Sequence, residues 1–208
     1  MQVTVFGASG RVGRLVVEEL LARKHQPTVF VHRHNPFEGN VAVTVVRGDI
    51  HVADDVCQAL EGSDAVISTL GSWGTKQKDV VSGGMAVIIP TMRKLGLRRI
   101  VSLTGADAHD TTDKPGAVQK ISHMASGLLL GKIVKDGEKH IRLLRASDLE
   151  WTVIRSPVMN TFGGDNYALR PRWSSPVRTI NRRAVAKAMV DQLDSRDFIC
   201  KSPTIFRR

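Results

Sequence analysis

Three glycines stand where a short apolar run gives way to a helical pattern, and this junction constrains the fold more than any other part of the chain. The run Val3–Phe6 is rich in β-branched residues, and Gly-Ala-Ser-Gly-Arg-Val-Gly follows it at Gly7–Gly13. A first glycine at such a junction permits a tight turn, and a last one lets a helix pack close to the strand. Apolar residues then recur at helical spacing through Arg11–Arg23, namely Val12, Leu15, Val16 and Leu20. The junction predicts a strand–turn–helix unit at the start of an α/β sheet.

The alternation of strand and helix patterns continues along the chain. Almost continuous apolar runs, typical of parallel strands buried on both faces, occur at Val3–Phe6, Thr28–Val31, Val43–Val46, Ala65–Thr69, Ile100–Leu103, Trp151–Ile154 and, more weakly, near Pro203–Phe206. Helical patterns fill the gaps at Arg11–Arg23, Asp54–Leu60, Asp79–Leu95, Lys132–Ala146 and Arg183–Leu193. We predict a doubly wound, mostly parallel α/β sheet with helices on both faces. Residues 1–208 are expected to form a single domain, because this length suits one hydrophobic core.

Two stretches, 105–117 and 156–180, depart from the alternation. The first is polar and contains Asp107, Asp110 and Asp113, and the second is rich in Gly, Pro and Trp. Both follow predicted strands, so they are expected at the carboxyl edge of the sheet, where open α/β sheets bind their ligands. We predict that the two loops shape a small substrate-side region.

The positive charge of the chain is uneven. The net charge is +10, and residues 155–208 contain eleven Lys and Arg against four Asp and Glu. One interpretation is attraction to nucleic acid, and the other is a basic surface that also attracts an anionic cofactor. The aromatic content of 5% and the absence of a nucleic-acid motif favour the second interpretation.

Composition bears on the cellular compartment of the protein and on disulfide and metal sites. No run of apolar residues approaches the 18 or so that a membrane span needs, and we expect neither a membrane span nor a signal peptide. Cys57 and Cys200 are the only cysteines, which fits a reducing, cytoplasmic setting better than a disulfide framework. No ligand spacing repeats, so we predict no metal site.

The glycine junction also predicts a dinucleotide site. Backbone amides at the start of the helix, at the positive end of its dipole, are suited to hold a pyrophosphate that approaches a glycine backbone. The candidate cofactor-binding residues of the turn are Gly7, Ser9, Gly10, Arg11, Val12 and Gly13. The alternative is a turn that merely requires small residues.

The end of the second predicted strand favours NADP(H) over NAD(H). An NAD enzyme usually has an acid there to accept from the ribose hydroxyls. This chain has His32-Arg33-His34 instead, and a guanidinium such as that of Arg33 pairs with a 2′-phosphate. The alternative for Arg33 is a solvated strand-end residue, which leaves NAD(H) as the second candidate cofactor.

Two further strand ends extend the predicted site. Asp49 and Ile50 follow the third strand, where an acid is placed to accept from the adenine amino group. Thr69, Leu70 and Gly71 follow the fourth, where a glycine permits close approach to a ribose. Gly and Asp are common at strand ends because they favour turns, so these residues indicate a cofactor site only in combination with the glycine turn.

With these motifs the chain resembles the NmrA-like, NAD(P)H-binding group of atypical short-chain dehydrogenases, which includes biliverdin reductase B/flavin reductase and bacterial NADH-flavin reductases. The resemblance rests on the glycine turn and on the segments 47–49, 64–71, 99–102 and 143–157, of which the last is the most specific. It implies a Rossmann sheet with a bound dinucleotide. It also implies that Arg155-Ser156-Pro157 borders the nicotinamide, which adds Ser156 and Pro157 to the candidate cofactor residues.

The Tyr–Lys pair of ordinary short-chain dehydrogenases is absent. The only tyrosine, Tyr167, has Pro171 four residues on in place of Lys, and it follows the sixth strand. Ser102 and Thr104, at the end of the fifth strand, are the candidate catalytic hydroxyls, and Ser102 is also placed to bond the nicotinamide amide. The alternative for Ser102 is a hydroxyl bonded to a neighbouring backbone group.

Other polar residues are expected to have no catalytic part. We interpret Lys135 and Lys139 as a solvated pair beside Asp136 and Glu138, the alternative being that one of them reaches the cofactor. We interpret His123 and His140 as isolated side chains.

Two functions fit these observations. The first is an NAD(P)H-dependent oxidoreductase, with NADPH preferred, that transfers hydride to a flavin, quinone or similar conjugated acceptor. Such an acceptor takes its proton from water and needs no strong acid on the protein. The second is a non-catalytic NAD(P)-binding sensor of the NmrA type that binds a partner protein. The sequence leaves the oligomeric state open.

Overall fold

The structure is a computed structural model that describes residues 1–72, 78–171 and 179–208, with side chains left out at 118, 119, 122 and 125–129. Its centre is a sheet of eight strands in the order β3-β2-β1-β4-β5-β6-β10-β8. The strands are β1 (Gln2–Phe6), β2 (Gln26–Val31), β3 (Thr44–Arg47), β4 (Ala65–Ser68), β5 (Arg99–Gly105), β6 (Glu150–Ser156), β8 (Tyr167–Arg170) and β10 (Thr204–Arg207). All neighbours pair in parallel except β10 and β8. The sheet is therefore doubly wound and mostly parallel, which confirms the predicted fold class.

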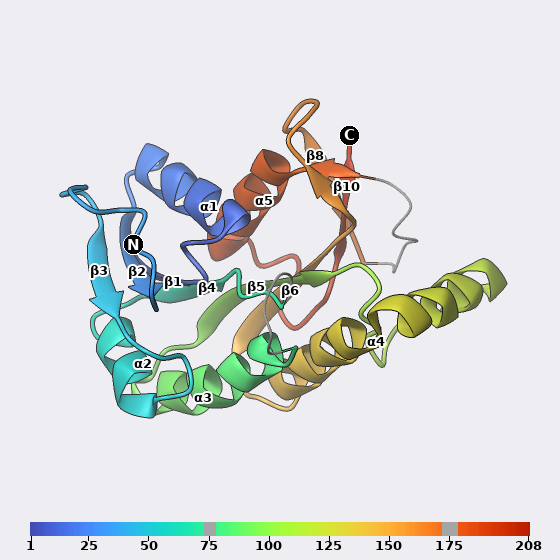
Figure 1. Ribbon diagram of the computed structural model, residues 1–208, viewed down its shortest axis with the longest axis horizontal. Coiled ribbons are helices and arrows are strands. Elements are labelled where there is room, and N and C mark those ends of the chain that lie inside the picture. The colour runs from blue at the N-terminus through green and yellow to red at the C-terminus, as the bar shows by residue number, and fades with distance from the viewer. Residues whose placement is uncertain (73–77, 172–178) are drawn as a thin grey trace.

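Helices cover both faces of the sheet (Figure 1). On one face lie α1 (Arg11–Ala22) and α5 (Arg182–Asp194), and on the other lie α2 (Ala53–Leu60), α3 (Val80–Lys94) and α4 (Ala117–Arg145). No helix in the part of the chain that the structure describes has the length and apolar character to cross a membrane.

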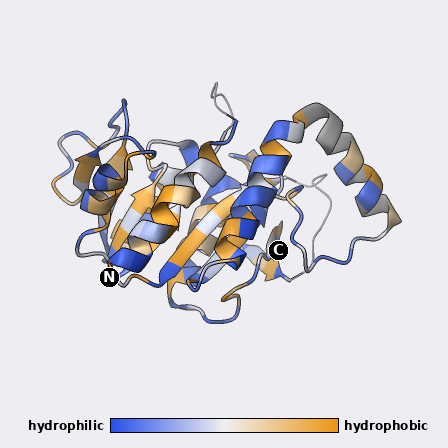
Figure 2. Cartoon of the chain, turned by 90° about the horizontal axis from the view of Figure 1, so that it is seen from below, coloured by the Kyte–Doolittle hydropathy of each residue, from blue (hydrophilic) through white to orange (hydrophobic). Residues whose placement is uncertain are grey.

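Two apolar layers hold the helices to the sheet. Along β1, Val3 and Val5 pack into the layer under α1 and α5, while Phe6 packs into the layer under α2, α3 and α4. Each layer buries aliphatic side chains completely, which is the main favourable term in folding. The central strands are accordingly mostly hydrophobic in Figure 2, whereas much of the hydrophilic colour lies on loops and outer helix faces.

The stretch 156–180 contains more regular structure than the sequence indicates. Strands β7 (Met159–Asn160) and β9 (Ile180–Asn181) pair in parallel as a small second sheet, and β8 joins the main sheet antiparallel to β10. The prediction of a loop throughout was therefore wrong. Pairing between segments that are far apart in the chain created these strands, and local patterns do not report such pairing.

Helix α4 begins earlier than its sequence pattern suggests. It was expected to start at Lys132, but it starts at Ala117 and changes direction at Leu130, whose backbone has φ −126° and ψ 21°. The part before Leu130, here called the arm, projects from the body of the molecule (Figure 1). The rest of α4 packs on α3, β5 and β6. The irregular residue interrupts the helical periodicity, which explains why the sequence revealed only the second half.

Candidate functional site

The ends of β1 and β4 meet at the carboxyl edge of the sheet, as predicted. Phe6 and Ser68 are partners in the parallel register, so Gly7 and Thr69 emerge side by side. The Thr69 N–H donates to the Phe6 carbonyl at 2.9 Å, and its hydroxyl lies 3.0 Å from the Gly7 carbonyl. The segment Thr69–Gly71 is thereby fixed against the glycine turn.

Two of the three glycines in the turn are required by the protein's own packing. Gly7 has φ +76°, and a Cβ there would lie 2.7 Å from the Thr69 carbonyl carbon. A Cβ on Gly13 would lie 2.3 Å from the Gly7 carbonyl oxygen, so only glycine lets α1 approach the turn this closely. At Gly10 the same test gives 3.1 Å, which is merely tight.

The start of α1 fits an anionic group. Its N-cap residue is Gly10, no side-chain cap bonds it, and its first turn contains no acid. The first amides of a helix have no partner within the helix, and the positive end of the helix dipole lies there. Val12 is buried in the core and Arg11 is exposed, so Val12 offers a ligand its backbone amide alone.

A hydrogen bond ties the turn to the loop after β2. The Ser9 hydroxyl donates to the His34 carbonyl at 2.8 Å, and Arg14 Nε donates to the Ser9 carbonyl at 3.1 Å. His32, Arg33 and His34 are all exposed. The predicted 2′-phosphate residue, Arg33, therefore stands beside the turn with its guanidinium accessible to solvent.

Asp49 and Ile50 lie at the same edge, beyond β3. The Asp49 N–H donates to an Asp55 carboxylate oxygen at 2.8 Å, and one carboxylate oxygen of Asp49 accepts from the His51 N–H at 2.9 Å. Asp49 thus also performs the turn role that its position suggested. Ile50 and Leu70 approach one point of α3, because a Cβ on Gly84 would lie 3.0 Å from Ile50 and 2.7 Å from Leu70.

Gly71 differs from the other glycines of the site. It is exposed, and a Cβ built there would meet no atom of the described residues within 4 Å. The described packing therefore does not require glycine at this position. The open space beside Gly71 fits the predicted contact with a ribose.

Ser102 does not lie where a catalytic hydroxyl would contact a ligand. It is completely buried, and its Oγ lies 2.9 Å from His140 Nε2. Ser102 pairs in register with Ser68, which precedes Thr69 in the chain. The Ser102 side chain lies under α4. Its partner is a side chain and not the neighbouring backbone, and His140 is not isolated as expected. Burial lowers the pKa of His140 to about 4.

Thr104, two residues further along β5, is partly exposed. Its hydroxyl packs closely against α4, since a Cβ on Gly137 would be 2.5 Å from it. Ser156 pairs with Gly105, and its carbonyl accepts from the Ala106 N–H at 2.8 Å. Thr104 and the predicted nicotinamide residues Ser156 and Pro157 therefore share one corner of the sheet edge, although Ser156 and Pro157 are themselves buried.

Two ion pairs anchor the loop after β5. Arg155 and Asp113 pair at 2.5 Å with both side chains almost fully buried, and Arg145 pairs with buried Asp110 at 2.6 Å. Burial raises the pKa of Asp110, but the hydrogen bonds from Arg145 and Ser202 outweigh it and hold the pKa below its ordinary value. The polar loop at 105–117 is thus held against the body of the molecule by Asp110 and Asp113, whose side chains point inward.

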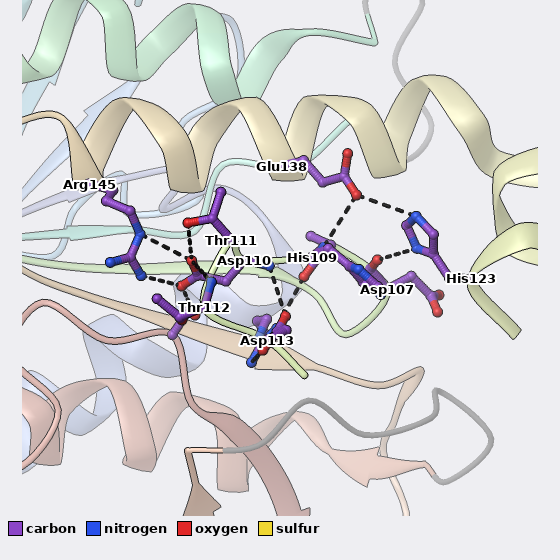
Figure 3. Close-up of polar contacts among 12 residues, drawn as sticks. Asp107, His109, Asp110, Thr111, Thr112, Asp113, His123, Glu138 and Arg145 are labelled. Atoms are coloured by element: carbon purple, nitrogen blue, oxygen red, sulfur yellow. Dashed lines mark hydrogen bonds and ion pairs between the residues drawn. The ribbon is translucent and has the colours of Figure 1, made fainter. Parts of the chain in front are cut away.

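The arm of α4 contacts this loop through two histidines (Figure 3). The rings of His109 and His123 stack with centroids 4.0 Å apart, and His123 Nε2 lies 3.5 Å from a Glu138 carboxylate oxygen. Burial, together with the neighbouring His123, lowers the pKa of His109. The expectation that His123 is isolated was wrong, because it contacts His109 in a loop distant in the sequence and Glu138 in the second half of α4.

Asp136 is a site neighbour that the sequence did not reveal. It lies beside the lysines that were expected in solvent, yet it is itself buried and accepts a hydrogen bond of 2.9 Å from the hydroxyl of Ser72, which directly follows Gly71. Asp136, Gly137 and His140 all contact the body of the molecule. Their spacing, which puts them on one helix face, could have indicated that Asp136 faces inward. Among the described residues, no cluster of three or more His, Cys, Asp or Glu is arranged to hold a metal ion.

Known proteins share this architecture. A yeast relative, the UPF0659 protein YMR090W of Saccharomyces cerevisiae, is 26% identical over 208 residues, which cover 93% of this chain and 87% of the relative. A short-chain dehydrogenase/reductase from Veillonella parvula, solved in complex with NADP, superposes with a TM-score of 0.78 at 21% identity over 98% of this chain and 93% of its own. The anaerobilin reductase ChuY from Escherichia coli O157:H7 gives a TM-score of 0.79 at 19% identity over 100% and 97%.

The structural matches show a common Rossmann-type fold. A family model described as NAD(P)H-binding matches residues 7–196, from the first glycine of the turn to the end of the last helix region. The glycine turn, the open start of α1 and this match agree, and the chain therefore belongs to the NAD(P)H-binding family.

Proposed function

We propose that the protein is an NADPH-dependent reductase of a flavin, quinone or similar conjugated small molecule. The observation that carries the proposal is the open start of α1, tied through Ser9 to the loop that exposes Arg33. The amides of the turn would hold the pyrophosphate, and Arg33 would pair with the 2′-phosphate. The NADP in the Veillonella relative supports this choice of cofactor.

The chain's own residues would orient the nicotinamide end. Gly71 would admit the ribose, and Thr104, Ser156 and Pro157 would border the ring at the corner between β5 and β6. The bound cofactor supplies the hydride. Thr104 is partly exposed at this corner and would donate a hydrogen bond to the acceptor.

An acid on the protein is not needed for such an acceptor. Tyr167, the only tyrosine, donates to Asp191 between β8 and α5, and burial raises the pKa of its phenol. It therefore takes no part at the sheet edge. A conjugated ring system that receives a hydride takes its proton from water. The reductase named among the structural relatives, anaerobilin reductase, supports an acceptor of this general kind.

A non-catalytic sensor is the second candidate. Ser102 is buried and Tyr167 is bonded to Asp191, so neither hydroxyl serves chemistry at the sheet edge, and the arm of α4 exposes Ile121 and Met124 to a partner. The sensor would use the same dinucleotide site. It differs in having no turnover.

NADPH oxidation with FMN, riboflavin or a quinone as acceptor separates the two candidates, with NADPH binding measured by calorimetry on the same sample. A reductase oxidises NADPH faster with protein than without it for at least one acceptor. Tight NADPH binding without any turnover indicates the sensor. No heat with either reduced nucleotide at millimolar concentration rules out both.

A further inference from the structure

The carboxylate of Asp136 joins two parts of the molecule. It projects from α4, is 5% exposed, and accepts three hydrogen bonds. One oxygen accepts from the Ser72 hydroxyl at 2.9 Å and from the Val81 N–H at 3.1 Å, and the other accepts from the Ser82 N–H at 2.9 Å. A buried carboxylate is costly unless its lone pairs are satisfied, and these three bonds satisfy it.

Two of these bonds cap α3 from outside. The N-cap residue of α3, Asp79, makes no side-chain cap bond, while Val81 and Ser82 lie in the first turn of the helix. The first amides of a helix need an acceptor, and a negative charge there interacts favourably with the helix dipole. Asp136 supplies both functions from a different helix and so fixes the start of α3 to α4.

The third bond reaches the cofactor edge of the sheet. Ser72 follows Gly71 directly, and Thr69 at the other end of the segment is bonded to the glycine turn. The segment 69–72 is thus held at both ends, by the turn through Thr69 and by α4 through Ser72. The exposed glycine, Gly71, lies between the two anchors.

The same face of α4 supports the neighbouring strand. Gly137 packs against the Thr104 hydroxyl, and His140 bonds Ser102 below it. Asp136 and its neighbours therefore set the position of the β4 end relative to the β5 end. The first of these strand ends leads to Gly71, the proposed ribose contact, and the second carries Thr104, which is proposed to border the nicotinamide.

We propose that Asp136 is a positioning residue for the cofactor and acts through Ser72, by holding Gly71 at the distance that lets the ribose approach its backbone. The inference rests on the proposed function. Asp136 has no part in a chemical step, because its carboxylate is bonded to Ser72, Val81 and Ser82 of the protein itself.

Ser72→Ala separates positioning from structural support. It removes the bond to the cofactor segment and leaves both bonds to α3. Loss of one such hydrogen bond is expected to raise the Kd for NADPH about three- to tenfold by calorimetry, with the unfolding midpoint little changed. Ser82→Ala is the matched control, because its hydroxyl is buried without a partner among the described residues while its amide still bonds Asp136. This variant should bind NADPH like the unaltered protein.

Hydrogen exchange gives a readout that does not depend on the cofactor. Ser72→Ala should raise exchange at residues 69–72 alone, and Asp136→Asn should raise it both there and at the start of α3. Equal NADPH affinity and equal exchange in Ser72→Ala and the unaltered protein would overturn the inference while leaving the proposed function intact. Absence of NADPH binding by the unaltered protein would instead overturn the proposed function, and the inference with it.

Discussion

At the scale of single residues, Arg33 is the proposed determinant of the preference for NADPH over NADH. Its side chain is exposed beside the turn, in the loop tied to Ser9. Arg33→Ala should weaken NADPH binding by roughly 1.5–3 kcal/mol, the scale of a charge-assisted hydrogen bond, and should change NADH binding little. Calorimetry with both nucleotides measures this difference. An equal loss for NADH and NADPH would contradict the role given to Arg33.

Gly7 and Gly71 make a matched pair with opposite expectations. At Gly7 an added Cβ meets the Thr69 backbone and φ is +76°, so Gly7→Ala should lower the free energy of unfolding by about 1–3 kcal/mol. At Gly71 the Cβ meets no atom of the described residues within 4 Å. Gly71→Ala should therefore leave stability within about 0.5 kcal/mol and weaken NADPH binding. Urea unfolding and calorimetry on both variants check this, and unchanged NADPH affinity in Gly71→Ala would argue against a ribose at that position.

At the scale of elements, the loop after β5 is shaped by its ion pairs. Asp113→Ala leaves the buried Arg155 charge without its partner and should lower the free energy of unfolding by about 3–5 kcal/mol. Replacing both residues, as Asp113→Leu with Arg155→Met, should recover most of that loss because no buried charge remains. Chemical denaturation of the single and double variants makes the comparison. A double variant as unstable as the single one would show that the pair matters for more than its charges.

At the scale of the whole molecule, buried His140 makes stability depend on pH. Its pKa is about 4 in the folded protein against an ordinary value of 6.5, so between these values the unfolded chain binds a proton that the folded one does not. The contribution of neutral His140 to the free energy of unfolding is fully present above pH 6.5. It is lost as the pH falls toward 4, by roughly 3 kcal/mol in total. In His140→Gln, the free energy of unfolding should change less with pH between these values than it does in the unaltered protein. His51→Gln, at an exposed histidine, should retain the dependence.

Features fixed by local chemistry were predictable from the sequence, and features fixed by tertiary contacts were not. The glycine turn has a local cause in φ and close packing at Gly7 and Gly13, and the buried strands have a local apolar pattern. The direction of Ser102 depends on His140 in a distant helix, and strand β8 exists only because β10 lies beside it. The burial of Asp136 was not predicted either, because it depends on Ser72 and on the start of α3, which are distant in the chain.

The phosphate end and the nicotinamide end of the proposed cofactor site are supported by different helices. The phosphate end depends on α1, which packs on one face of the sheet, whereas the corner near Thr104 depends on α4, which packs on the other. Several strands of hydrogen-bonded backbone stand between these helices. Under the proposed function, substitutions in the loop that Arg145 anchors, away from Asp136, are therefore expected to change which acceptor is reduced while α1 keeps its hold on the pyrophosphate, so that a single nucleotide-binding half can serve reductases with different substrates.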